Sequence, residues 1–110
     1  MPVATQNSEL KVIINHADNQ MVVFMNGKKV KEIQAPPGDP SLSEDVDVGG
    51  MLLPGRNTLL LLGINFSKRA RFQARVTLDG NDIGEWDRVF SSDGTPGGLI
   101  WEAALDIQVP

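Results

Sequence analysis

Residues 21–33, Met-Val-Val-Phe-Met-Asn-Gly-Lys-Lys-Val-Lys-Glu-Ile, predict two short strands around a tight turn. The first strand covers Met21–Met25, the second covers Lys29–Ile33, and Asn26-Gly27 joins them. Asparagine and glycine both tolerate positive φ, which a two-residue hairpin turn requires. The second arm is polar at alternate positions, which indicates an exposed edge strand. This stretch is therefore typical of antiparallel β-structure.

The rest of the chain continues the pattern. Apolar residues alternate or form short runs, and residues that favour turns separate them, as in Pro54-Gly55. Further strands are predicted over residues 9–15, 45–48, 59–62, 71–78, 82–90 and 99–109. The unbroken Leu59–Leu62 run predicts a strand covered on both faces, and Leu99 is expected to be buried beside Trp101. A long apolar period of 3.6 residues, typical of helices, is absent.

Together these segments predict an all-β protein, an antiparallel β-sandwich of the jelly-roll type with seven to eight strands. Residues 1–7 are expected to form a flexible N-terminal tail, and residues 8–110 a single sandwich domain. The predicted core consists of Val12, Ile14, Val23, Leu60, Leu62, Phe72, Val76, Trp101, Leu105 and Ile107.

Composition narrows the classes of function. The 110 residues include no cysteine, which excludes disulfides, thiolate metal sites and cysteine nucleophiles. The N-terminus lacks the features of a secretory signal, and no apolar stretch approaches the ~20 residues that cross a bilayer. A net charge of −4 provides no basic excess for a nucleic-acid partner. The sequence favours the cytoplasm, with neither nucleic acid nor membrane as partner.

Three segments resemble a known family: Phe24–Val30, Asp45–Asp47 and Leu53–Leu59. They are similar to the galactose-binding-like jelly-roll, in particular to the non-catalytic sugar-binding domain of family 2 glycoside hydrolases. The similar features are an Asn-Gly-Lys hairpin, an Asp-Val, and a turn of the Pro-Gly-x-Asn-x-Leu kind. The resemblance implies a stand-alone binding module with no catalytic residues.

Acidic residues are concentrated between positions 79 and 93. Glycosidases use paired carboxylates, but such a pair needs a shaped, partly dry cleft, and nothing local indicates one. The sequence therefore favours solvent-facing carboxylates and a protein that is not an enzyme. Residues 79–84 begin like a calcium-binding EF-hand loop, but Ile83 and Phe90 occupy ligand positions. A different calcium site, between Asp79–Asp82 and the loop of Asp93, remains open, and no other cofactor is indicated.

The two tryptophans are the strongest ligand candidates. Trp101 shares its phase with core residues, whereas Trp86 is out of phase with Ile83 and Val89. Trp86 is therefore exposed for binding, covered by another subunit, or packed in the core together with Phe90, whose phase it shares.

The leading hypothesis is a lectin-like carbohydrate-binding module. Trp86 would be its stacking platform, and its polar ligand-binding residues would be Asp87, Arg88, Asn81 and Asp93. The alternative is a structural or interaction protein that forms a homodimer, or docks to a partner, through a sheet face. That interface would include the Lys29–Ile33 edge and a basic strip formed by Lys68, Arg69, Arg71 and Arg75. Cross-strand ion pairs with the Asp82–Asp87 strand are the simpler expectation for that strip.

Overall fold

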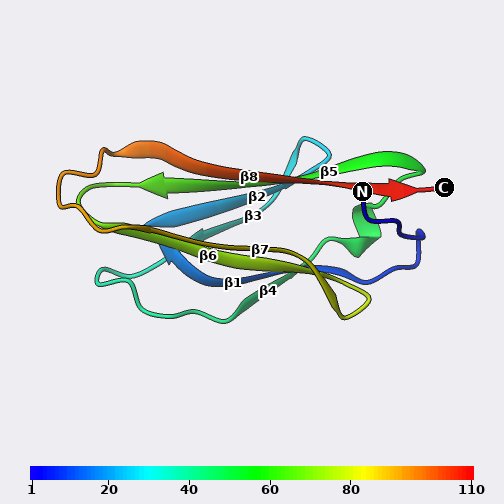
Figure 1. Ribbon diagram of the computed structural model, residues 1–110, viewed down its shortest axis with the longest axis horizontal. Helices are drawn as coiled ribbons and strands as arrows, with labels where there is room; N and C mark the ends of the chain where they lie inside the picture. The colour runs from blue at the N-terminus through cyan, green and yellow to red at the C-terminus, as the bar shows by residue number, and fades with distance from the viewer.

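Eight strands form two four-stranded antiparallel sheets that pack face to face in the computed structural model, which describes residues 1–110 (Figure 1). The strands are β1 (Leu10–Asp18), β2 (Gln20–Met25), β3 (Lys28–Gln34), β4 (Glu44–Asp47), β5 (Gly55–Asn65), β6 (Ala70–Leu78), β7 (Asn81–Phe90) and β8 (Gly98–Val109). The sheet orders are β4-β1-β6-β7 and β3-β2-β5-β8. This confirms the predicted all-β antiparallel sandwich. The single 3₁₀ turn, Gly49–Met51, is far too short to span a membrane.

The chain crosses between the sheets repeatedly. Only β2–β3 and β6–β7 are hairpins within one sheet, and every other connection joins one sheet to the other. The connections that follow odd-numbered strands gather at one end of the sandwich (left in Figure 1). Those that follow even-numbered strands lie at the opposite end together with both termini. Loops that are far apart in the sequence therefore meet at each end.

Two of the three segments that carry the family resemblance, Phe24–Val30 and Leu53–Leu59, are joined to each other by hydrogen bonds. Asn26 and Gly27 form the β2–β3 turn with φ of 51° and 81°. The Asn26 side chain accepts a bond from the Thr58 backbone N–H (2.9 Å) and donates one to Asn57 Oδ1 (2.9 Å). The Pro-Gly turn places Gly55 at φ 94°. The motif thus builds the end of the sandwich that holds the termini.

The core follows the alternation of each strand. Leu59 and Leu61 face inward, whereas Leu60 and Leu62 lie half-buried on the outer face. The expectation that Leu60 and Leu62 belong to the core, under cover on both faces, was therefore wrong, because no further layer packs over this sheet. The predicted core residues Val12, Ile14, Val23, Phe72, Val76 and Ile107 are buried, and Trp101 and Leu105 are half-buried against them.

A β-bulge changes the faces of β8. Gly63 pairs with Trp101 but Ile64 pairs with Leu99, so Ile100 is an extra residue in the strand. Leu99 therefore lies on the outer face and is 58% exposed, which corrects the expectation that it is buried beside Trp101.

Residues 2–4, which fall in the predicted tail, run parallel to the end of β8. Val3 bridges Gln108, whose backbone exchanges hydrogen bonds with Ala4 (2.8 Å) and Pro2 (2.9 Å). Ala4 is only 3% exposed and joins the core. The prediction of a flexible tail over residues 1–7 is corrected for this part, because backbone pairing and burial hold it against the sandwich.

Candidate functional site

Trp86 faces the space between the two sheets. It is paired with Ala74, whose side chain points into the core, and its ring meets that of Trp101 edge-on with centroids 6.4 Å apart. Trp101 in turn stacks on Phe72 at 5.7 Å. The sequence places Trp86 out of phase with Ile83, yet Trp86 faces the core. A β-bulge at Ile83 explains this, because the extra residue shifts the alternation of inward and outward side chains before Trp86. The half-buried indole belongs to the edge of the core and is not a free stacking platform.

The other predicted ligand residues do not gather around Trp86. Asp87 lies on the outer face, and Arg88 lies on the inner side of β7 with its guanidinium carbon 4.7 Å from the centre of the Phe90 ring. Asn81 begins β7, whereas Asp93 follows it in the β7–β8 loop. A ten-residue strand is about 30 Å long. Trp86, Asp87, Arg88, Asn81 and Asp93 therefore do not form one site.

The same separation applies to the possible calcium site. The β6–β7 turn, which holds Asp79, and the β7–β8 loop, which holds Asp93, lie at opposite ends of the sandwich (Figure 1). They cannot share one ion. No group of three or more His, Asp or Glu side chains comes together closely enough to hold a metal.

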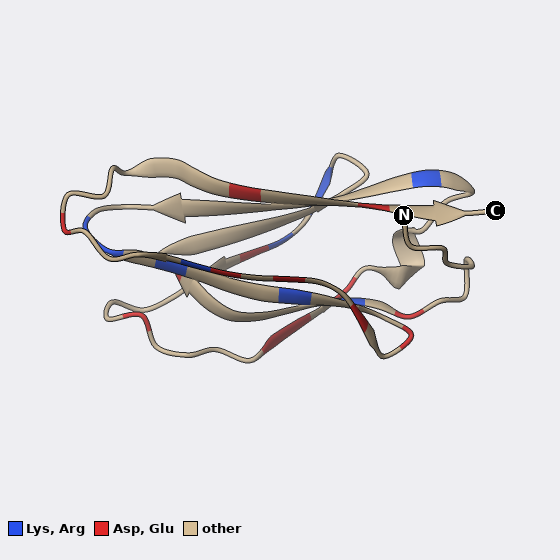
Figure 2. Ribbon diagram, in the orientation of Figure 1, with Lys and Arg blue, Asp and Glu red and all other residues tan.

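The two arginines of the basic strip that lie on β6 are paired with acidic residues of β7, as the sequence predicts. Arg71 makes a bidentate contact with Asp87 at 3.1 and 2.9 Å, and Arg75 lies 3.3 Å from Asp82. The hydrogen bonds from Arg71 hold the pKa of Asp87 below its ordinary value. Figure 2 shows basic and acidic segments side by side on these strands. Paired charges leave little free positive surface on this face.

A cavity of about 890 Å³ opens at the end of the sandwich opposite the termini. We call it the loop-end pocket. Four connections line it: the β1–β2 junction, the β3–β4 loop, the β5–β6 loop with the start of β6, and the end of β7 with the loop that follows. Its lining residues include Asp18, Asn19, Asp39, Phe66, Lys68, Arg69, Arg71, Val89 and Asp93. Asp93 is the only one of the five predicted ligand residues among them.

Asp18 is the least satisfied polar group of this pocket. It is 9% exposed, and its carboxylate makes no hydrogen bond and no ion pair within the protein. Burial, and then the charge of Asp39, raise the pKa of Asp18 above its ordinary value. Arg71 is its neighbour in the β1–β6 register, but the Arg71 guanidinium binds Asp87 instead. Asp18 is therefore a largely buried residue whose carboxylate has no protein partner and still contacts solvent.

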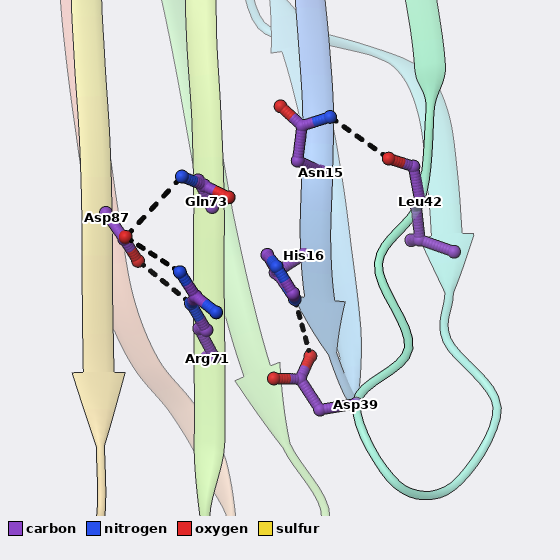
Figure 3. Close-up of polar contacts among 7 residues, drawn as sticks. All are labelled: Asn15, His16, Asp39, Leu42, Arg71, Gln73 and Asp87. Atoms are coloured by element: carbon purple, nitrogen blue, oxygen red, sulfur yellow. Dashed lines mark hydrogen bonds and ion pairs between the residues drawn. The ribbon is translucent and has the colours of Figure 1, made fainter.

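The β3–β4 loop closes one side of the pocket and is held at two points (Figure 3). Asp39 Oδ1 lies 3.0 Å from Nδ1 of His16 on β1, and Asn15 Nδ2 donates to the Leu42 carbonyl at 3.0 Å. The His16 side chain is 12% exposed. Asp39 therefore satisfies His16, and the β3–β4 loop largely covers its side chain.

Phe66 provides an exposed aromatic surface in this pocket, which polar and apolar residues line together. It is 53% exposed and follows the buried end of β5. Asn19 positions it, because Asn19 Oδ1 accepts a hydrogen bond from the Phe66 backbone N–H at 2.7 Å and the Asn19 N–H donates to the Ile64 carbonyl. Sequence reasoning missed Phe66, Asp18 and Asn19. The available signal was a single aromatic residue in the polar segment Asn65-Phe66-Ser67-Lys68.

No family model, curated protein or solved structure matches this chain. The pocket offers an aromatic ring, carboxylates, an amide and guanidinium groups, which bind polar ligands with apolar faces. The side chain of His16 contacts Asp39, and no serine hydroxyl lies within hydrogen-bonding distance of it.

Proposed function

We propose that the protein is a non-catalytic carbohydrate-binding module whose binding site is the loop-end pocket. The exposed ring of Phe66 in a pocket that combines polar and apolar surface is the observation that carries the proposal. Sugars combine flat C–H faces, which pack on aromatic rings, with hydroxyl groups that need hydrogen-bonding partners. Only four of the 15 lining residues are hydrophobic, and a volume of about 890 Å³ lies in the usual range of ligand sites.

The resemblance to the galactose-binding-like jelly-roll supports the same class of function. Its similar segments contain Asn26 and Asn57, which stabilise the opposite end of the sandwich. These segments therefore support the fold of a sugar-binding domain. They lie away from the pocket, so they would not contact a ligand there. The contacts would come from the loops at the other end, which include Asn19, Phe66 and Asp93.

Phe66→Ala is expected to weaken sugar binding about tenfold, because the sugar face loses its aromatic partner. Glycan-array screening followed by calorimetry on the best ligand measures this effect. The fold should be unaffected, since the ring is half in solvent. Trp86→Ala is the comparison variant, because Trp86 lies outside the pocket. If Trp86→Ala abolishes binding in a folded protein while Phe66→Ala binds normally, the site lies on β7 and not in the pocket.

A second candidate function is self-association through the outer face of the β3-β2-β5-β8 sheet. Phe24 is paired with Leu60, Val22 with Leu62, and Ile64 with Leu99, so apolar side chains are adjacent across three strands. The predicted Lys29–Ile33 edge corresponds to β3, an edge strand of this sheet. A second copy of the chain would cover this face and remove its apolar surface from water.

Sedimentation velocity tests this second candidate. The wild-type protein is expected to form dimers at micromolar concentration, and Leu62→Lys is expected to be monomeric because it places a charge at the centre of the face. A wild-type protein that stays monomeric at every concentration would exclude self-association.

A further inference from the structure

Most charged groups in and beside the loop-end pocket are paired within the chain. The pairs are Arg69–Asp93 at 3.0 Å, Arg71–Asp87 at 2.9 Å and His16–Asp39 at 3.0 Å. Two charged lining residues, Asp18 and Lys68, make no ion pair or side-chain hydrogen bond. Lys68 is exposed, so water solvates its ammonium. Asp18, in contrast, is largely buried, so a bound ligand can supply hydrogen bonds and charge that its limited contact with water does not.

A largely buried carboxylate without a protein partner is unfavourable, because burial removes part of its hydration and no protein group replaces it. The Asp18 side chain lines the pocket and its oxygens keep some contact with solvent there. The nearby Asp39 adds negative charge, as the direction of the Asp18 pKa shift indicates. The adjacent cation, Arg71, is already held by Asp87 in a bidentate contact. The unsatisfied carboxylate lines the pocket, so a bound molecule is the available source of a compensating charge.

We infer that the sugar bound in the loop-end pocket carries a protonated primary amine, which Asp18 binds as an ammonium–carboxylate pair. This inference rests on the proposed carbohydrate-binding function and specifies its ligand class as amino sugars with a free amine. An ammonium group supplies both hydrogen-bond donors and the opposite charge, whereas a hydroxyl supplies only a donor. A metal ion fits less well, because no third acidic or histidine ligand lies close by.

Two matched sets of sugars test the inference just below neutral pH, which protonates the amine and stays well clear of the acidic range where the raised pKa of Asp18 would neutralise its carboxylate. The first set is glucosamine trimer, N-acetylglucosamine trimer and cellotriose, which differ only in the group on carbon 2. The second set is galactosamine, N-acetylgalactosamine and galactose. In at least one set, the wild-type protein should bind the amine about tenfold more tightly than both neutral members, as a charge-assisted hydrogen bond implies.

Asp18→Asn should reduce that preference to within about twofold, because the amide retains the shape and loses the charge. The variant should fold, since it removes a charge that burial disfavours. Amide NMR spectra verify its fold. Asp45→Asn is the matched control, because Asp45 is exposed on β4 outside the pocket, and it should retain the full preference.

The outcomes separate this inference from the proposed function. Binding of neutral sugars with equal or higher affinity than the amines would overturn the inference and leave the carbohydrate-binding proposal intact. An amine preference that persists in Asp18→Asn would also overturn it. If neither set binds and a wider glycan array gives no ligand, both the proposed function and the inference fail.

Discussion

Asn57→Asp is expected to lower the free energy of unfolding by about 3–5 kcal/mol, the usual cost of leaving a charge buried and uncompensated. Asn57 is completely buried at the start of β5. Its Nδ2 donates to the backbone carbonyls of Leu53 (2.8 Å), Gly55 (3.2 Å) and Ile107 (3.4 Å). An aspartate would place a negative oxygen against these carbonyl oxygens. Because domains are stable by only about 5–15 kcal/mol, such a loss is severe.

The effect should depend on pH in a defined direction. Burial among carbonyls raises the pKa of the new carboxyl in the folded state, so its cost is complete above that raised pKa. The cost shrinks as the pH falls toward the ordinary aspartate value of about 4. Urea denaturation at several pH values measures this. Asn7→Asp, at an exposed position, is the control and should change little. Equal urea midpoints for the two variants would show that the Asn57 amide is not needed.

Phe72→Ala is expected to cost about 3–5 kcal/mol of stability, as for other buried phenylalanines replaced by alanine. The ring is fully buried, stacks on Trp101 at 5.7 Å and meets Phe90 edge-on at 6.2 Å. It also lies over Gly63, where a Cβ would be only 2.9 Å from the ring. The substitution leaves a cavity between the sheets and removes the stacked partner of Trp101.

Thermal unfolding followed by tryptophan fluorescence measures the effect of Phe72→Ala. The Trp101 emission should change even in the folded variant, because its stacking partner is gone. Phe66→Ala is the matched control, since the same side chain is removed from a half-exposed loop position and should change stability by less than about 0.5 kcal/mol. Similar melting temperatures for the two variants would contradict the central position of Phe72 in the core.

Turn chemistry explains why the architecture was predictable. Asn26-Gly27 and Asp79-Gly80 both adopt positive φ, and each joins two strands as the sequence indicates. Alternation then separates inner from outer residues along β6, where Phe72 and Val76 are buried. These features are local, so a single sequence contains them.

The bulges were not predictable from alternation. Each bulge adds one residue to a strand, so every side chain beyond it changes face relative to a strict period of two. The bulge at Ile83 turns Trp86 toward the core, and the one at Ile100 turns Leu99 outward. The predicted stacking platform rested on the phase of Trp86 relative to Ile83, which is the point where the register shifts.

The candidate pocket was missed for a different reason. Asp18, Asp39 and Phe66 are separated by 20 to 50 residues and meet only because the connections after odd-numbered strands share one end of the sandwich. Asp18 in particular lies beyond the predicted strand of residues 9–15, whereas in the structure it ends β1 and lines the pocket. Which loops converge depends on the strand order, and local patterns do not specify that order.

The pairing of residues 2–4 with the end of β8 places the two ends of the chain side by side. A host protein can therefore carry this domain as an insertion in one of its surface loops without separating the flanking host segments. The molecule is 46 Å long, and its loop-end pocket lies at the end opposite the termini. An inserted copy would therefore present the loop-end pocket away from the host protein.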